Sequence, residues 1–443
     1  MAFAVAGRSL RRAGLAALIT LALLSLGAAR ASALPGLSQL SQALRGPISG
    51  LHVDLACANP ANHGLLRSVL GAAKVNVGGP LRCFAKAIAH GHDRGPQIMA
   101  GPTGLGPKQI QSAYKLAGLV SGGRTVAIVD AFDNPKAASD LATFRKAYGL
   151  PPCTVANGCF KKVNQNGAAS PLPAGDYGWA EEISLDLDAV SAACPDCHIL
   201  LVEANSATTS DLGKAVDTAA TSPGVASVSN SWGGTEDSTI LGADAHFKHP
   251  GVAITASSGD TGYGVSWPAS SQYVTGVGGT TLSSASSSRG WTETAWSGAG
   301  SGCSAFEPKP SWQKDTGCSK RTVADVSADA DPNSGLGVYD TYNSCGSSSA
   351  CDMLIGLGAV QGLDGWAQVG GTSLSSPLIA SAYALAGNTG SVTYGSYPYS
   401  HPGSLFDVTS GSNGTCTPGY LCTAGAGYDG PTGLGTPNGT GAF

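Results

Sequence analysis

Short apolar runs alternate with helix-like stretches along the chain from Pro107 onward. Buried strands are predicted at 125–129, 199–202, 226–228, 252–256 and 273–277, and helices at 138–148 and 211–220. Short apolar strands separated by helices are typical of a parallel sheet that is covered on both faces. The pattern therefore predicts an α/β fold, in which functional residues gather at the carboxyl ends of the strands.

A further helix is predicted at 178–193, where helix-forming residues follow one another and acids lie in the first turns. At about 100° per residue its apolar residues define one broad face. The opposite face takes Glu181, Ser184, Asp188 and Ser191. Glu182 and Asp186, four residues apart, fall within the apolar face.

Two carboxylates on an apolar face would be held close together in a medium of low dielectric, so that they share a proton. Such pairs are typical of functional sites. The alternative is an acidic first turn favoured by the helix dipole. That alternative explains Glu181 and Asp188 but not Glu182 and Asp186.

A candidate nucleophile lies in the sequence G-G-T-S-L-S-S-P at 370–377, which precedes an apolar helix. At the start of a helix, backbone N–H groups and the helix dipole favour negative charge, which would help an oxyanion form beside Ser373. An ordinary N-cap explains G-T-S equally well. The S-x-P that follows makes the segment similar to the nucleophile segment of subtilisin-like peptidases.

No histidine offers the base that a subtilisin needs. His198, His246, His249 and His401 lack the H-G-T context and are interpreted as structural or exposed. The available base is therefore the pair Glu182 and Asp186.

Asp260, in S-G-D-T-G, follows the apolar run 252–256 and is expected at the carboxyl edge of the sheet. A protonated carboxyl there could donate a hydrogen bond to an oxyanion. The alternative is a turn aspartate between glycines.

Together, E-x-x-x-D at 182–186, S-G-D-x-G around Asp260 and G-T-S-x-S-x-P around Ser373 resemble the sedolisin, or serine-carboxyl peptidase, family over residues 104–443. The resemblance implies a subtilisin-like three-layer fold and cleavage of proteins at acidic pH. It implies that Ser373 attacks the scissile carbonyl and that Glu182 takes its proton. Asp186 would orient Glu182, and Asp260 with the Ser373 amide would hold the oxyanion.

The resemblance extends to two other segments of the chain. S-N-S-W-G is similar to the substrate-pairing strand of the family, which makes Ser229, Ser231, Trp232 and Gly233 candidate substrate-binding residues. Near the end of the chain, two carboxylates and glycine-exposed carbonyls offer the oxygen ligands that calcium prefers, although a Gly-rich turn explains the same residues. The resemblance implies one Ca²⁺ ion, held by Asp407, Asp429 and the carbonyls of Val408, Gly425 and Gly427.

The composition argues against nucleic acid and anionic membranes as partners. Charged residues make up 12% of the chain, and the net charge of -4 leaves no basic surface for nucleic acid or an anionic membrane.

Twelve cysteines fall into six close couples, which favours disulfides and an oxidising compartment. The couples are Cys57/Cys83, Cys153/Cys159, Cys194/Cys197, Cys303/Cys318, Cys345/Cys351 and Cys416/Cys422. Cys194 and Cys197 have redox or zinc half-site spacing, but a structural bridge is preferred because nothing completes a zinc set.

The start of the chain predicts export. A basic start, an apolar run at 13–29 and Ala31-Ser32-Ala33 indicate a signal peptide at 1–33, with a membrane anchor as the alternative. Residues 34–103 are interpreted as a short prosegment and linker, followed by a peptidase domain at 104–443. This prosegment is shorter than is usual in the family and carries Cys57 and Cys83.

The expected protein is a secreted, monomeric acid endopeptidase that acts on proteins or peptides. A tripeptidyl exopeptidase of the same family and an inactive secreted binding protein of the same fold are the alternatives.

Overall fold

The computed structural model describes residues 81–88, 101–342 and 365–443, together with the backbone of 52–53. All of these belong to one compact unit, 50–443. The predicted signal peptide at 1–33 and most of the predicted prosegment at 34–103 lie outside the described residues. Among the described residues, no helix has the length and apolar character needed to cross a lipid bilayer.

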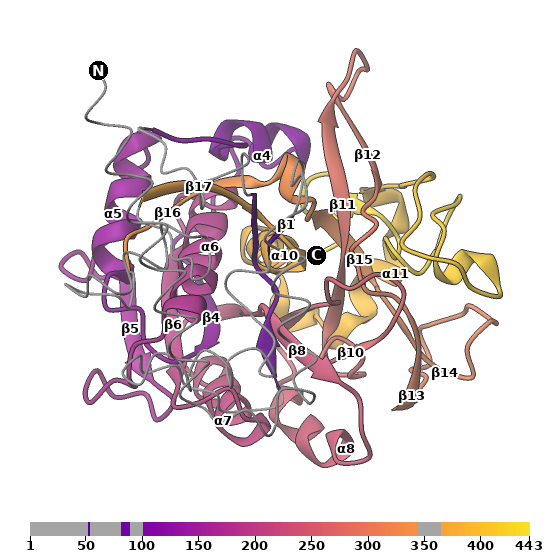
Figure 1. Ribbon diagram of the computed structural model, residues 1–443, viewed down its shortest axis with the longest axis horizontal. Coiled ribbons are helices and arrows are strands. Elements are labelled where there is room, and N and C mark those ends of the chain that lie inside the picture. Colours follow the sequence, from indigo (N-terminus) through magenta and orange to yellow (C-terminus); the bar gives the residue numbers. More distant parts are fainter. Residues whose placement is uncertain (1–51, 54–80, 89–100, 343–364) are drawn as a thin grey trace, which may run out of the picture. The chain divides into compact units, whose positions relative to one another are not determined.

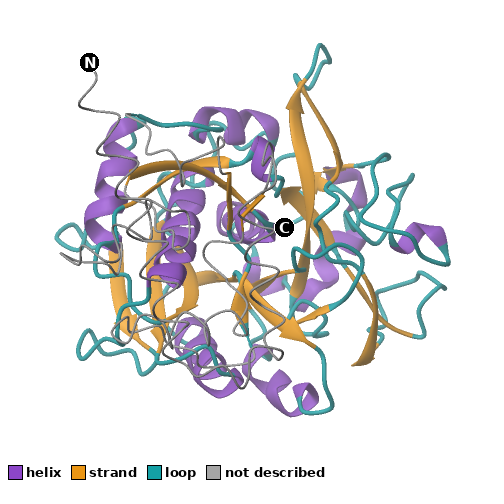
Figure 2. Cartoon of the chain, viewed as in Figure 1, coloured by secondary structure: helices purple, strands orange, loops and turns teal. Residues whose placement is uncertain are grey.

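The centre of this unit is an eight-stranded sheet that is parallel except at one edge (Figures 1 and 2). Its strand order is β12-β11-β9-β7-β4-β6-β5, with β15 beside β11, and only β12 runs antiparallel to its neighbour. The strands are β4 (Thr125–Ala131), β5 (Phe160–Asn164), β6 (His198–Ala204), β7 (Val225–Asn230), β9 (Ala253–Ser257), β11 (Thr275–Ser284), β12 (Trp291–Ala295) and β15 (Val326–Asp329). The predicted parallel α/β sheet is confirmed.

Helices cover both faces of this sheet. On one face, α6 (Tyr177–Ala193) and α10 (Thr372–Ala386) pack against each other, with α4 (Pro107–Ala113) and α5 (Ala137–Ala147) beside α6. On the other face, α7 (Thr209–Ala220) packs on β4 and β6. The helices predicted at 138–148, 178–193 and 211–220 are all present, each within two residues of its expected bounds.

Helix α6 begins at an aspartate cap, because the side chain of Asp176 accepts hydrogen bonds from the backbone N–H groups of Gly178 and Trp179. Every residue from 178 to 193 is buried. The face opposite the apolar one is also enclosed: Asp188 accepts from the backbone of β16 (Leu336–Asp340), and Ser191 accepts from Arg145 of α5. Other elements therefore pack on both sides of the helix.

Helix α10 includes the candidate nucleophile in its first turn. Its N-cap is Gly371, and Ser373 is the second residue of the helix and not, as the sequence suggested, the residue just before it. Gly371 has a φ of 95°, a conformation that favours glycine. Its preceding strand, β17 (Gly365–Gly370), pairs with β16 (Leu336–Asp340).

Several antiparallel ribbons surround the central sheet, and the sequence pattern did not predict them. The strand β8 (Trp232–Thr235) lies between β10 (Ser266–Trp267) and β2 (Arg82–Cys83), and β3 (Lys86–Ile88) lies between β17 and β1 (His52–Val53). The remaining pairs are β13 (Gly302–Pro308) with β14 (Lys320–Val323) and β18 (Leu405–Phe406) with β19 (Thr436–Pro437). Two short helices, α8 (Ile240–Ala243) and α11 (Tyr397–Ser400), lie outside the central layers of helices described above.

Four predicted cysteine couples form disulfides: Cys153–Cys159, Cys194–Cys197, Cys303–Cys318 and Cys416–Cys422. Cys83 is also disulfide-bonded, but its predicted partner Cys57 and the couple Cys345/Cys351 lie outside the described residues. The preference for a structural bridge at Cys194–Cys197 agrees with the structure.

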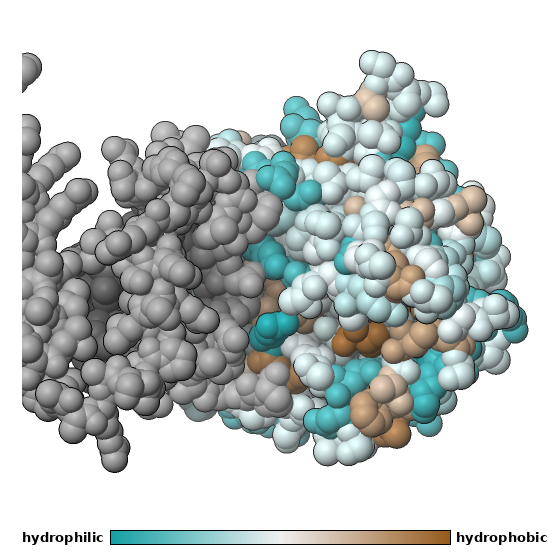
Figure 3. Space-filling model, turned by 45° about the vertical axis from the view of Figure 1, so that its right-hand side comes forward, coloured by the Kyte–Doolittle hydropathy of each residue, from teal (hydrophilic) through white to brown (hydrophobic). Residues whose placement is uncertain are grey.

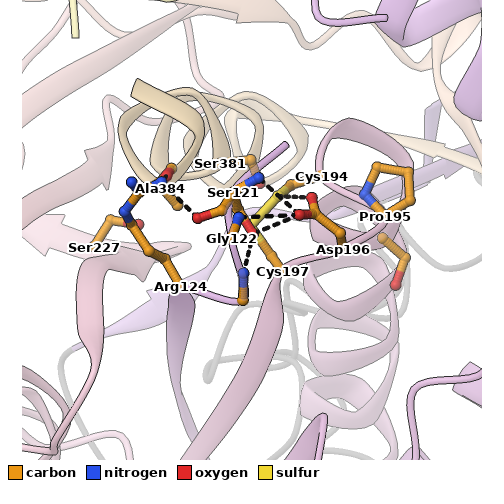
Figure 4. The surroundings of a disulfide bond; sticks show 12 residues. Ser121, Gly122, Arg124, Cys194, Pro195, Asp196, Cys197, Ser227, Ser381 and Ala384 are labelled. Carbon is orange, nitrogen blue, oxygen red and sulfur yellow. Dashed lines mark hydrogen bonds between the residues drawn. A yellow bond between two sulfur atoms is a disulfide. The ribbon is translucent and has the colours of Figure 1, made fainter. Parts of the chain in front are cut away.

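The Cys194–Cys197 disulfide belongs to a junction between the two central helices (Figure 4). Asp196, between the two cysteines, accepts from the N–H and hydroxyl of Ser121 at 2.7 and 3.0 Å. Arg124 donates to the carbonyl of Ala384 at the end of α10 over 3.0 Å. The cation therefore interacts with the negative end of the α10 dipole, and the ends of α6 and α10 are fastened to the start of β4.

The surface seen in Figure 3 is mostly pale or teal, with brown apolar residues in small groups. Large apolar side chains that are exposed in the described part of the chain include Val120 and Val155, at 73% and 65%.

Candidate active site

Glu182 lies on α6 with its carboxyl group fully buried. Its Oε2 accepts hydrogen bonds from two consecutive backbone N–H groups, those of Phe84 at 3.0 Å and Ala85 at 2.8 Å. Burial, followed by the charge of Asp130, raises the pKa of Glu182 well above its usual value, while the nearby Ser373 side chain opposes that rise. The second carboxyl oxygen of Glu182, Oε1, has no hydrogen-bond partner among the described residues. Glu182 and Ser373 are thus brought together from positions 191 residues apart.

Asp186 lies one turn further along α6 and is also fully buried. Its Oδ1 accepts from the hydroxyl of Ser231 at 2.7 Å. Burial, then the charges of Asp130 and Glu182, raise the pKa of Asp186 well above its usual value. The two acids therefore interact electrostatically, as the spacing on the apolar face predicted.

Ser231 connects this acid pair to the candidate nucleophile. Its hydroxyl donates to Asp186, and its carbonyl oxygen lies 3.2 Å from the hydroxyl of Ser373, which donates to it. Ser373 lies in the first turn of α10 and is fully buried. Because the first-turn N–H groups of a helix have no intrahelical acceptors, the Ser373 amide is suited to bind an oxyanion.

A third acid, Asp130, was missed by the sequence analysis. It is fully buried near the end of β4, and neither carboxylate oxygen has a hydrogen-bond partner among the described residues. Burial raises the pKa of Asp130 to about 8. A carboxyl group in the otherwise apolar strand V-A-I-V-D-A was the available signal, because an ionisable residue inside a buried strand is costly unless it has a role.

Asp260 follows β9, at the carboxyl edge of the sheet as predicted. Its Oδ1 accepts from the backbone N–H of Thr372 at 2.9 Å and from the Thr372 hydroxyl at 2.7 Å. A Cβ atom built on Gly371 would come within 2.6 Å of Asp260 Oδ2. Asp260 is therefore held against the residues that immediately precede Ser373.

The four candidate substrate-binding residues have different environments. Gly233 and Trp232 use their backbones to pair with Arg82 and Cys83, respectively. The Trp232 indole is buried and donates to the carbonyl of Val129. Ser231 belongs to the acid network described above. The Ser229 hydroxyl is instead within 2.9 Å of Ser376 Oγ, in the interface between β7 and α10.

An extended segment, residues 81–88, passes directly through this site and belongs to the stretch that the sequence analysis assigned to a prosegment and linker. Its first half pairs antiparallel with β8 and its second half pairs antiparallel with β17. Between the two halves lie Phe84 and Ala85, the residues that bind Glu182. Lys86 Nζ also donates to the carbonyl of Asp260 over 2.7 Å.

The proposed calcium ligands meet in one loop region. Asp407 Oδ2 accepts from the N–H of Gly427, and Asp429 Oδ2 accepts from the N–H of Gly425. Burial, with a further contribution from the charge of Asp407, raises the pKa of Asp429 to about 7. Among the described residues, no backbone N–H group donates a hydrogen bond to the carbonyls of Val408, Gly425 or Gly427.

This donor set fits a calcium ion. Two neighbouring carboxylates and three carbonyl oxygens are hard oxygen ligands, and a divalent cation would relieve the repulsion between the acids. No cluster of three or more His, Cys, Asp or Glu side chains suited to a metal occurs in the described part of the chain. A metal here would consequently depend on backbone oxygens as well as on Asp407 and Asp429.

Comparison with known proteins finds relatives that are 28–35% identical to this chain. The chain is 30% identical to kumamolisin from Bacillus sp. over 371 residues, which cover 77% of this chain. It is 28% identical to sedolisin from Pseudomonas sp. over 419 residues, which cover 84% of it. Xanthomonalisin from Xanthomonas sp. is 35% identical over 204 residues, or 40% of this chain and 21% of that protein.

The chain belongs to the sedolisin family. The solved structure of Pseudomonas sedolisin, a serine-carboxyl proteinase complexed with pseudo-iodotyrostatin, matches with a TM-score of 0.61 and 27% identity. That match covers 76% of this sedolisin-family chain and 96% of the solved chain, which confirms the subtilisin-like α/β fold. The chain spans 63% of the length of kumamolisin and 65% of that of sedolisin. No protein-family model matches it.

Proposed function

We propose that this chain is a secreted serine-carboxyl endopeptidase that acts in acid. The observation that carries the proposal is the convergence of Glu182, Asp186 and Ser231 on Ser373 at the start of a buried helix. A serine needs a neighbouring base to become nucleophilic. Glu182 is the acid beside its hydroxyl.

In the proposed reaction, Ser373 Oγ attacks the carbonyl carbon of the substrate while Glu182 accepts the hydroxyl proton. The same proton then passes to the leaving amine, and water hydrolyses the acyl-enzyme. Asp186 shares negative charge and protons with Glu182 through the buried acid cluster that also contains Asp130. The Ser373 amide and a protonated Asp260 would stabilise the oxyanion.

Action in acid follows from the types of group involved. A carboxyl group can donate to an oxyanion only while it holds its proton, and a carboxyl base is effective when its pKa is near the working pH. The buried acid cluster, in which the pKa values of all three carboxyls are raised, supports proton sharing in place of the histidine base of subtilisins.

An endopeptidase is favoured over a tripeptidyl exopeptidase. The segment 81–88 extends through the site with paired residues on both sides of the catalytic candidates. Strand edges that pair with an internal stretch of this chain can pair with an internal stretch of a protein substrate. Protein or peptide substrates are proposed accordingly, with a monomeric enzyme and neither nucleic acid nor membrane as a partner.

One Ca²⁺ ion is proposed at Asp407 and Asp429, with the carbonyls of Val408, Gly425 and Gly427. When bound, it would supply positive charge that holds this loop region together. Secretion is proposed from the signal-like segment 1–33 and agrees with the disulfides of the described chain.

The test is an assay with a denatured protein substrate from acidic to neutral pH, using wild type and Ser373→Ala side by side. Cleavage that peaks in acid and is absent from the variant is expected. Equal activity in the two proteins would overturn the assignment of Ser373, and no activity in folded wild type would favour the inactive binding protein.

A further inference from the structure

We propose that the site binds a basic side chain at the second residue after the cut bond of a substrate, and that Trp296 selects this side chain. This inference rests on the proposed peptidase function. It adds a specificity subsite on the leaving-group side of the site and the chemical class of side chain that fits it.

The segment 81–88 indicates where the backbone of a substrate can run on that side. The N–H of Ala85 lies 2.8 Å from Glu182 Oε2. An amine that leaves from a cut bond must lie within reach of the acid that returns its proton, so the nitrogen of Ala85 marks the place of a leaving amine. Lys86 comes next and is paired with Gly370 of β17. A substrate residue paired with Gly370 is therefore the second residue after the cut bond.

The side chain of Lys86 indicates what this position binds. Its Nζ donates to the carbonyl oxygen of Asp260 over 2.7 Å and lies 5.6 Å from the centroid of the Trp296 ring. Lys86 is half-buried. An ammonium group in this position has a carbonyl acceptor and the face of an aromatic ring, both of which carry partial negative charge.

The indole of Trp296 is held in place by small neighbours. A Cβ added to Gly298 would lie 2.3 Å from the ring, and one added to Gly279 would lie 3.2 Å from it. The ring is 6% exposed, and with Ala299 and Ala330 it forms a small apolar cluster separate from the main core of the described chain. Because its neighbours leave little freedom to the ring, the aromatic surface is already positioned for a ligand.

A basic side chain fits this subsite better than a neutral or an acidic one. The stem of a lysine can lie along apolar surface while its ammonium group reaches the carbonyl of Asp260. Norleucine has a similar stem but no charge and no hydrogen-bond donor. Glutamate would bring negative charge to a carbonyl oxygen and to the negative face of the ring. The cation–π contact and the hydrogen bond together should favour lysine over norleucine by about 10-fold in kcat/KM.

The experiment uses the purified full-length chain in acid and internally quenched peptides of one sequence. The peptides have phenylalanine and alanine at the expected cut bond and differ only at the second residue after it, which is lysine, norleucine or glutamate. Mass spectrometry locates the cut bond, and kcat/KM is measured for each peptide. Every peptide has to displace residues 81–88, so this common cost cancels in the ratio between peptides. We expect the lysine peptide to be cut about 10-fold faster than the norleucine peptide, and the glutamate peptide to be cut slowest.

Two tryptophan variants form a matched pair. Trp296→Leu removes the aromatic face, and the ratio of lysine to norleucine should fall to about 3-fold or less. Trp312→Leu is the control, because Trp312 also has a cation over its ring, that of Arg321 at 5.0 Å, but packs against Tyr399. This control should keep the wild-type ratio. If Trp296→Leu does not fold, as judged by thermal unfolding, Trp296→Phe replaces it, and its smaller ring should also lower the ratio.

The outcomes separate the subsite from the proposed function. Wild type that digests a denatured protein but shows no preference for lysine among the peptides retains the function and refutes the subsite. A preference that is unchanged in the Trp296 variant refutes the role of Trp296. Wild type that digests neither the protein nor any peptide refutes both proposals.

Discussion

The hydroxyl of Ser231 lies 2.7 Å from Asp186 Oδ1, and the same residue's carbonyl accepts a hydrogen bond from Ser373. One residue at the end of β7 therefore contacts both the acid helix and the nucleophile helix. Its position depends on the parallel sheet, because β7 must end at the edge where α6 and α10 meet.

The role of Glu182 can be tested against its neighbour Glu181. Glu182→Gln should lower kcat/KM for a denatured protein substrate at acidic pH by about 1,000-fold, because an amide cannot accept the serine proton. Glu181→Gln serves as the control, since Glu181 is equally buried but its pKa is raised by burial and Asp340 and not by the acid cluster. Similar losses in both variants would indicate that the helix, and not the base, had been damaged.

Stability should decrease as pH rises from about 4 to 9. Burial raises the pKa of Glu181 and Asp130 to about 8 and that of Glu203 to about 9. Between the unfolded and folded pKa values the native state binds more protons than the unfolded state, so stability falls with increasing pH. The stabilisation by these protonated acids is fully present below the pKa values that the groups have in the unfolded state.

Each unit of pKa shift at one group corresponds to about 1.4 kcal/mol, so the Tm at pH 4 should exceed that at pH 8 by several degrees. Differential scanning calorimetry on Ser373→Ala avoids self-digestion. Glu181→Gln should reduce the difference between the two pH values, and a Tm that rises toward pH 8 would contradict the buried, protonated acids.

Calcium removal should destabilise the C-terminal loop region. A chelator is expected to lower the Tm of Ser373→Ala, and restored calcium should reverse the loss. At a free calcium concentration of 100 times the Kd, binding should add about 2.7 kcal/mol to the free energy of unfolding. In the Asp407→Asn background the chelator should have little further effect. The exposed Asp237→Asn variant is the control and should respond as the parent does, whereas no response in the parent would argue against a calcium site.

A buried ion pair away from the site offers a test of the fold. Arg321 donates to Asp325 Oδ1 over 2.7 Å, both residues are fully buried, and Asp325 also accepts from the N–H of Gly276. Arg321→Met would leave a carboxylate without its cation and should cost about 3–5 kcal/mol in the free energy of unfolding. Lys314→Met, at an exposed position, should cost less than about 1 kcal/mol by denaturant titration.

Local pattern was sufficient for the central sheet, its helices and the main candidates at the site. The runs around β4, β6 and β9 predicted parallel strands because a short run of consecutive apolar residues can be recognised without knowledge of distant parts of the chain. Glu182 and Asp186 could be paired because helical spacing alone brings them to one face. Cysteine couples that are close in the chain were paired correctly where the structure describes them.

Other features could be recognised only in three dimensions. Asp130 joins the acid cluster because β4 lies beneath α6, and residues 81–88 enter the site because they pair with strands more than 140 residues away. The enclosure of the polar side of α6 has the same origin. Such contacts depend on the register and packing of distant segments, and the free energy of those contacts is not encoded in any single stretch of sequence.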